Sequence, residues 1–314
     1  MRAGVGVPRH DGVMTVTPAP EARPAVRLGV AFVPTMPPES LRSLATAVEA
    51  AGLDDLWVWE DCFKQSGVAS AAAALAWTER VRVGIGLMPA PLRSTAVTAM
   101  EVATVARMFP GRFVPAVGHG VQAWMDQAGV RAKSPLTLLR EHTEALRALL
   151  AGDEVTTSGR YVTLDRVRLD WPAPRVPLLL GGVGPRSLAL AGELGDGVIL
   201  ANALTPDDVR AATETAGAAA RDAGRPVPGV FATLIAATGD GAQARLDAEL
   251  PLWGAEPGRG IGAAGDARAI ADAVLRLAAA GASAVAVQPT ADEPDLDGFV
   301  ELLGREVRPL LDQA

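Results

Sequence analysis

The 314-residue chain is poor in several residue types, and each shortage excludes a class of function. Cys62 is its only cysteine, so no internal disulfide forms and no cysteine cluster can hold a structural metal. Aromatic residues make up 4% of the chain, which argues against a surface that stacks nucleic-acid bases. Acidic residues outnumber basic ones by 36 to 29, so there is no basic field for nucleic acid or an anionic membrane. The expected partner is a small molecule.

The chain also lacks the long hydrophobic run of a signal peptide or a membrane span. Residues 1–25 hold four prolines with charges between them, which predicts a flexible N-terminal arm before a single domain over residues 26–314. Met14 is a second possible start of translation. With one cysteine and no targeting segment, the predicted location is the cytoplasm.

What the chain has in quantity is apolar sequence, at 49% of residues, enough for an extensive core. Short, near-continuously apolar runs predict strands buried on both faces of a parallel sheet: 27–33, 55–60, 81–87, 112–118, 177–181, 197–200, 229–236 and 284–288. Helical patterns separate them: 38–51, 67–78, 95–108, 135–150, 185–194, 206–223, 240–250 with 266–280, and 295–312. Eight such units favour a closed (β/α)8 TIM barrel over a doubly wound open sheet.

Residues 153–176 interrupt the alternation and predict a hairpin with a loop, inserted between the fourth helix and the fifth strand. This insertion either lines the functional site or serves packing. Ser134 and Asp266 are expected helix N-caps, and Gly52 and Gly281 stand where helices should end.

The functional site of such a barrel lies in the loops after the strands, and the loop after the fifth strand is rich in glycine. Its sequence, GGVGPRS at 181–187, brings glycines and a helix N-terminus together, and such amides bind anions. Arg186 can add a charged contact. The alternative is a tight turn without a ligand. The loop does not fit the dinucleotide-binding pattern, so a nicotinamide cofactor is not indicated.

Candidate acid–base residues follow two other strands. Glu60 and Asp61 come after the second strand, and His119, in Gly118-His119-Gly120, comes after the fourth. Each can move a proton, or can serve only as a helix cap, an ion-pair partner or a structural hydrogen bond.

Other reactive side chains carry less weight. No activating base stands near Cys62 in the sequence, so an inert thiol is expected, and Lys64 is expected to be solvated rather than to form a Schiff base. His10 and His142 are also expected to be solvated.

Two longer segments carry a resemblance. VRVGIGLMPAPLRSTAVTAMEVATVARMFPGRFVPAVGHG and VPLLLGGVGPRSLALAGELGDGVIL resemble the bacterial luciferase-like superfamily, in its coenzyme F420 branch, which includes methylenetetrahydromethanopterin reductase. The resemblance covers roughly residues 27–311. It implies a homodimer whose barrel holds F420, or FMN as the alternative, with the cofactor ring over the strand ends.

The resemblance also implies positions for the cofactor. The phosphate would lie on Gly181, Gly182, Val183, Gly184 and Arg186. The third strand would end in a bulge, often with a non-prolyl cis peptide, that presses on the ring; the candidate bonds are Gly86–Leu87 and Leu87–Met88. Gly118 and Gly120 would border the same ring.

The chain departs from the F420-dependent sugar-phosphate dehydrogenases of this superfamily. Their Asp-His pair after the second strand is Asp61-Cys62 here, and their glutamate after the fourth strand is Val121. Many members have Arg-His-Pro after the third strand, where this chain has Arg93-Ser94-Thr95. With only Lys64 and Lys133 present, their phosphate-binding lysines have no counterpart. Alcohol oxidation by that mechanism is disfavoured.

Three functions remain open. The first is an F420-dependent oxidoreductase, running as an F420H2-dependent reductase of a C=C, C=N or C=O bond, with Glu60 or Asp61, or in their place His119, as acid. The second is an FMN-dependent monooxygenase, and the third a non-catalytic cofactor-binding barrel. The apolar walls of the site are expected to be Phe32, Trp59, Met88 and Trp124.

Overall fold

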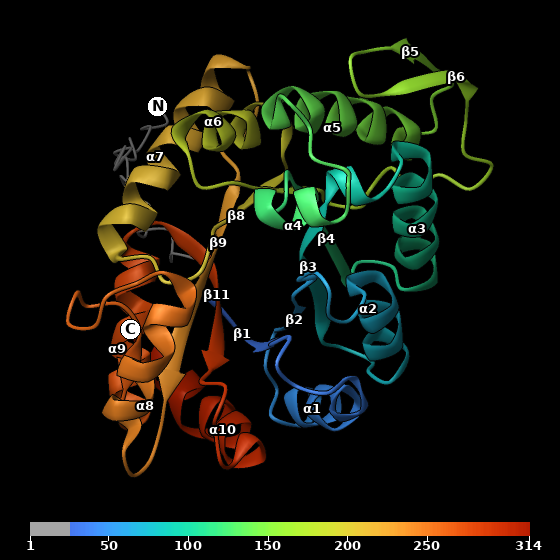
Figure 1. Ribbon diagram of the computed structural model, residues 1–314. Helices are drawn as coiled ribbons and strands as arrows, with labels where there is room; N and C mark the ends of the chain where they lie inside the picture. Colours follow the sequence, from blue (N-terminus) through green and yellow to red (C-terminus); the bar gives the residue numbers. More distant parts are fainter. Residues whose placement is uncertain (1–25) are drawn as a thin grey trace, which may run out of the picture.

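The computed structural model describes residues 26–314, so the predicted N-terminal arm and His10 lie outside the described residues. Nine strands form one parallel sheet, and pairing of β8 with β9 closes eight of them into a barrel, with the helices around it (Figure 1). The barrel strands are β1 (Arg27–Phe32), β2 (Asp55–Val58), β3 (Arg82–Pro89), β4 (Phe113–Gly118), β7 (Leu179–Gly181), β8 (Gly197–Ile199), β9 (Gly229–Ala237) and β11 (Ala282–Pro289). The (β/α)8 barrel is confirmed.

Helices follow the strands in the predicted alternation. Their bounds are α1 (Leu41–Ala50), α2 (Gly67–Ala76), α3 (Thr95–Met108), α4 (Gln122–Gln127), α5 (Pro135–Ala151), α6 (Pro185–Leu194), α7 (Pro206–Asp222), α8 (Ala242–Glu249), α9 (Ala267–Ala279), α10 (Leu296–Leu302) and α11 (Arg308–Asp312). Within residues 26–314, no helix has the length and hydropathy needed to cross a bilayer.

The short helix α4 and the two-residue strand β10 (Ala263–Ala264), which pairs with β9, were not predicted. Helical turns also flank the regular helices, at Pro38–Ser40, Ala90–Leu92 and Leu250–Trp253, and a π-turn at Leu303–Val307 joins α10 to α11. Such elements are shorter than the windows over which hydrophobic periodicity can be recognised.

Two tryptophans of the β2 region fill the barrel interior. Trp57 stacks on Phe231 of β9 with ring centroids 3.7 Å apart. The neighbouring strand β3 has glycine where it faces these rings: a Cβ on Gly84 would come within 2.5 Å of Trp57, and one on Gly86 within 2.4 Å of Trp59. Glycine is therefore required on the inner face of β3.

Three of the four predicted helix-end signals act as expected. Asp266 caps α9 by accepting the Ala269 N–H at 3.0 Å, while Gly52 and Gly281, just past α1 and α9, have φ of +71° and +113°. Ser134 precedes α5 but does not cap it, because its hydroxyl pairs with that of Thr137 at 2.8 Å.

The predicted insertion is a hairpin of β5 (Val155–Ser158) and β6 (Thr163–Val167), which lies beside α5 at the outside of the barrel (Figure 1). The carboxylate of Glu141 on α5 accepts three backbone N–H groups of the hairpin, at 2.8 to 3.0 Å. These bonds lower the pKa of Glu141 against the opposing effect of burial. The hairpin supplies none of the residues that line the cavity described below, so the structure favours a packing role.

His142 is not solvated, contrary to expectation. It is 2% exposed on α5, where Nδ1 lies 3.1 Å from the Thr95 hydroxyl and Nε2 has no partner within residues 26–314. The helix turns this position inward, toward α3. Burial lowers the pKa of His142 from 6.5 to about 4, because the charged ring would lose its hydration.

This burial predicts a specific acid sensitivity. The unfolded chain takes up a proton at His142 below pH 6.5, whereas the folded chain does so only near pH 4. His142 therefore lowers the free energy of unfolding progressively over this range, by ~3 kcal/mol in all. Urea unfolding of the wild type and of His142→Gln across this range tests the effect. The variant should lose less stability on acidification; equal losses in the two proteins would contradict the assignment.

Candidate active site

A cavity opens at the carboxyl end of the barrel, between the end of β3 and the loops after β2, β4, β7 and β8. Its volume is about 290 Å³. Three tryptophans, Trp59, Trp124 and Trp253, contribute to its apolar walls, and its polar side chains are Glu60, Asp61, His119 and Asn202. The cavity is mainly apolar with few polar groups, as ligand sites usually are.

The side chain of Leu87 forms part of the cavity wall, and glycines allow its placement. A Cβ on Gly118 would come within 2.7 Å of Leu87, and one on Gly181 within 2.2 Å. The Gly86–Leu87 peptide is cis, at one of the two bonds indicated by the resemblance. The pairing of β3 with β4 shifts register between Ile85 and Met88, as expected for a bulge. Leu87 is thereby turned toward the cavity.

The glycine-rich loop leads into an uncapped helix. Gly184 is the N-cap residue of α6, no side chain caps this end, and Pro185 occupies the first turn. A Cβ on Gly184 would meet nothing within 4 Å, so the loop is open on this side. Gly181, Gly182 and Val183 line the cavity directly. Backbone N–H groups at such a helix end attract an anion, and Arg186 stands exposed in the first turn.

Glu60 is held in an ion pair. Glu60 is 8% exposed. Its carboxylate accepts hydrogen bonds from both terminal nitrogens of Arg93 and, at 2.7 Å, from the backbone N–H of Gly67. Arg93 also pairs with Glu101 of α3, at 3.1 Å. These contacts join the β2 loop to α2 and α3. Glu60 is thus placed to support the loop that carries Asp61, and Arg93 is a site residue that sequence reasoning did not identify.

Asp61 has different surroundings. It lines the cavity, and its backbone carbonyl accepts the Lys64 N–H at 2.8 Å, but its carboxylate accepts no hydrogen bond from the described residues. Burial raises the pKa of Asp61, and Lys64 opposes the shift. A carboxyl group that retains its proton to higher pH suits general acid catalysis. Burial, together with the charges of Glu60 and Asp61, also raises the pKa of the Cys62 thiol, in keeping with an unreactive cysteine.

The hydrogen bonds around His119 determine its tautomer. Nδ1 lies 3.0 Å from the carbonyl oxygen of Gly120, which can only accept, so Nδ1 carries a proton. Gln122 donates to the carbonyls of His119 and Gly120, at 3.2 Å each, and steadies the loop. In the neutral ring Nε2 is therefore a hydrogen-bond acceptor.

The structure separates two expected wall residues from the cavity. Phe32 is fully buried and Met88 is 1% exposed, and both pack in the layer between the barrel and its helices. Neither lines the cavity. Gly118, which was expected to border the cofactor ring, does not line it either, because the Leu87 side chain packs against it. Sequence reasoning did not identify Asn202 or Trp253, although Asn202 lies in a loop directly after β8, where a site residue is expected.

Fold and cavity define a (β/α)8 barrel with a cavity at the carboxyl end of its strands, which is where barrels of this class have their sites. The chain belongs to the luciferase-like monooxygenase family, whose model matches residues 1–293.

Curated relatives resemble part of the chain. It is 33% identical over 198 residues to the 5,10-methylenetetrahydromethanopterin reductase of Methanolobus tindarius, covering 63% of this chain and 60% of the relative. It is 31% identical over 203 residues to the F420-dependent glucose-6-phosphate dehydrogenase of Nakamurella multipartita, covering 58% of each. The chain therefore matches about three fifths of these relatives' length.

Solved structures share the fold over nearly the whole barrel. The coenzyme F420-dependent tetrahydromethanopterin reductase of Methanopyrus kandleri superposes with a TM-score of 0.77 at 24% identity, covering 90% of this chain and 99% of that one. An F420-dependent secondary alcohol dehydrogenase in complex with an F420–acetone adduct gives a TM-score of 0.81 at 22% identity, covering 91% and 99%. At these identities the likeness is one of fold.

Proposed function

We propose that the protein is an F420-dependent oxidoreductase that works as an F420H2-dependent reductase of a C=C, C=N or C=O bond in a small organic molecule. The observation that carries the proposal is the cavity itself, which combines the Leu87 wall, an uncapped helix N-terminus and the protonatable Asp61. The names of the curated relatives, a methylenetetrahydromethanopterin reductase and an F420-dependent dehydrogenase, support it.

The residues present fit such a cofactor. Gly181, Gly182, Val183, Gly184 and Arg186 would hold its phosphate, since this loop offers backbone N–H groups, open space at Gly184 and an exposed guanidinium. Gly86, Leu87 and Gly120 would border its ring. When bound, the reduced deazaflavin supplies a hydride, and the chemistry of that transfer is the cofactor's own.

The protein itself supplies a proton and a site that orients the reactants and keeps water away from them. Asp61 donates a proton to the reduced substrate from its carboxyl oxygen, because its raised pKa keeps it protonated to higher pH. Glu60 and Arg93 hold the loop on which Asp61 stands. The tryptophans at the cavity exclude water from the reacting atoms.

Anaerobic oxidation of F420H2, followed optically with a panel of enones, imines and ketones, tests the proposal. Consumption of F420H2 that depends on the acceptor is the expected result.

The family description names monooxygenases, and this observation favours FMN-dependent oxygen chemistry as the second candidate. If the protein takes up oxygen with reduced FMN but does not oxidise F420H2 with any acceptor, the first proposal is wrong and the second is favoured. Tight F420 binding without turnover of any acceptor would indicate a non-catalytic barrel.

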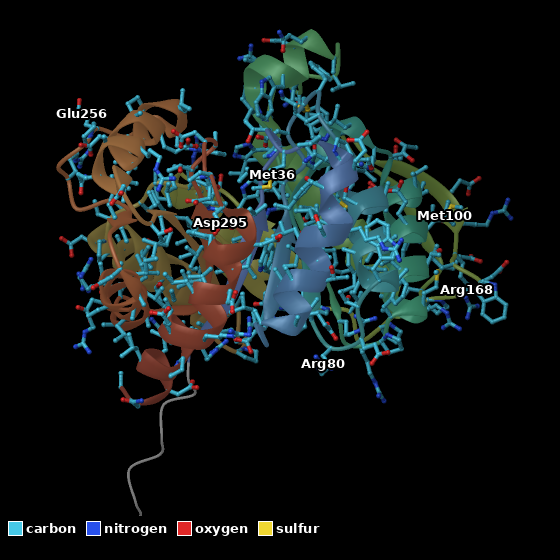
Figure 2. All side chains as sticks on the ribbon, turned by 90° about the horizontal axis from the view of Figure 1, so that it is seen from below. Met36, Arg80, Met100, Arg168, Glu256 and Asp295 are labelled. Atoms are coloured by element: carbon cyan, nitrogen blue, oxygen red, sulfur yellow. The ribbon has the colours of Figure 1, made fainter. Side chains whose placement is uncertain are left out.

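We further propose a homodimer that pairs through α3. The outer face of this helix exposes Val97, Met100 and Met108 by 44%, 60% and 62%, and Met100 lies at the outer surface (Figure 2). Apolar side chains grouped on one exposed helix face are typical of an association surface. A cytoplasmic location is proposed as well, on the single cysteine.

Charge on this face should split the dimer. The double variant Met100→Glu, Met108→Glu would place two carboxylates of each copy in the interface, where they would be buried. A shift from dimer to monomer is therefore expected. Light scattering coupled to size-exclusion chromatography measures it. Val227→Glu is the matched control, because Val227 is similarly exposed, at 51%, but lies beyond α7. A wild type that is already monomeric would contradict the proposal.

A further inference from the structure

A buried glutamine connects two residues of the cavity wall. Gln288, in β11, is completely buried, and its Oε1 accepts from Trp59 Nε1 and from Asn202 Nδ2, both at 3.0 Å. An indole N–H can only donate. The Gln288 atom that faces Trp59 is therefore the oxygen, and the Asn202 atom that faces this oxygen must be the nitrogen. The orientation of both amides follows from the single donor of Trp59.

This orientation leaves the carbonyl of Asn202 for the cavity. Asn202 lines the cavity and is only partly exposed. Its Nδ2 is occupied by Gln288, and no described residue donates to its Oδ1 within residues 26–314. His119 presents a second acceptor, Nε2, from the β4 loop. A substrate that fills the cavity without a donor would leave Oδ1 desolvated and unpaired, which costs binding free energy.

The charges of the cavity point in the same direction. Neither lysine nor arginine is among its described lining residues, whereas Glu60 and Asp61 both line it. Arg93, which touches Glu60, is already paired with two carboxylates. The only anion-binding feature at the described part of the cavity, the start of α6, is assigned to the cofactor phosphate. With the cofactor bound, an anionic substrate group would therefore lose its hydration without gaining a cation.

From these contacts we infer that the cavity selects an uncharged substrate bearing an N–H or O–H group, that this group donates to Asn202 Oδ1, and that Gln288 is the positioning residue that sets the preference. The inference rests on the proposed reductase function, because it names the substrate class of the same cavity. Phosphorylated and carboxylated acceptors are excluded as good substrates.

Three small probes of similar size separate these properties. The unsaturated lactam 5,6-dihydro-2-pyridone has an N–H, the corresponding lactone replaces it by a ring oxygen without added bulk, and 2-pentenoate is an anion. Their dissociation constants are measured by quenching of tryptophan fluorescence, with and without saturating F420. Trp59, Trp124 and Trp253 at the cavity report binding, so the measurement does not depend on turnover.

The wild type should bind the lactam about tenfold more tightly than the lactone. With F420 saturating, so that the start of α6 is occupied, it should bind 2-pentenoate most weakly. Asn202→Ala should reduce the lactam-to-lactone ratio to about one, with the affinity for F420 changed less than threefold. Gln288→Met should reduce the same ratio partway, since the Asn202 amide is then free to turn. Gln243→Ala, which removes an exposed amide on α8, should leave the ratio unchanged. Circular dichroism establishes that each variant is folded.

Equal affinities for lactam and lactone, or tightest binding of 2-pentenoate, would overturn the inference. So would an Asn202→Ala variant that loses F420 binding but keeps the lactam preference, because Asn202 would then serve the cofactor. Failure of the proposed function gives a different result: F420 does not bind, while the preference for the lactam still depends on Asn202.

Discussion

Replacing Asp61 with asparagine is expected to slow F420H2 oxidation by about 10²–10⁴-fold. Asparagine keeps the size of the side chain but has no proton to give. In the wild type the rate should fall as pH rises through the pKa of Asp61, because only the protonated carboxyl acts as acid. Since burial raises this pKa, the fall comes at higher pH than for an ordinary aspartate. The pH profile of kcat in both proteins measures the effect. The wild type should show this falling limb at high pH, and the variant should lack it.

Glu60→Gln is the matched control for Asp61→Asn. It replaces one of the two carboxylates of Arg93 by a neutral amide and leaves the pair with Glu101, so it should lower the free energy of unfolding by about 2 kcal/mol. The pH limb of kcat should remain, because Asp61 is unchanged. Loss of the limb in Glu60→Gln and its survival in Asp61→Asn would reverse the roles of the two carboxylates. If kcat still falls with rising pH in both variants, neither carboxylate is the acid, and His119 would be assigned that role.

Replacing Gly184 with aspartate is expected to have opposite effects on stability and on cofactor binding. Aspartate is a favoured N-cap, and Gly184 has an ordinary φ of −81° with open space where a Cβ would lie. Stability should therefore rise by about 0.5 kcal/mol. The same carboxylate would repel a phosphate about 5 Å away by ~3 kcal/mol at an effective dielectric constant of ~20, equivalent to a roughly hundredfold loss of F420 affinity.

Calorimetric titration with F420 and thermal unfolding of the same samples measure both effects of Gly184→Asp. Gly184→Ala, which adds bulk without charge, separates the electrostatic part. Arg186→Ala should weaken binding about tenfold, as expected for one charge-assisted contact. If Gly184→Asp binds F420 as the wild type does, the phosphate does not lie at the start of α6.

The barrel could be predicted because its strands are apolar on both faces and its helices have a different period. The same property explains why Phe32 and Met88 were wrongly predicted to line the cavity. At the end of β1, Ala31 and the following Val33 face the barrel interior and Phe32 faces the helices. When both faces of a strand are apolar, the sequence does not tell which face is the inner one. In β3 the register shift before Met88 turns it outward.

The loops of the site could also be predicted, because parallel strands bring their carboxyl ends to one edge. The pairings inside the site could not. Arg93 lies 33 residues from Glu60, and Gln288 lies 229 residues from Trp59. Such contacts depend on barrel closure and side-chain rotamers, for which a single sequence carries no local signal. Burial of His142 likewise depends on how α5 packs on α3.

The most direct test of the account is a titration of the purified protein with F420 and, separately, with FMN. Micromolar binding of F420 with none of FMN is the predicted result, and Gly184→Asp should weaken it strongly. Binding of FMN alone would contradict a deazaflavin reductase and favour oxygen chemistry. Binding of neither would contradict the cofactor site at Gly181, Gly182, Val183, Gly184 and Arg186.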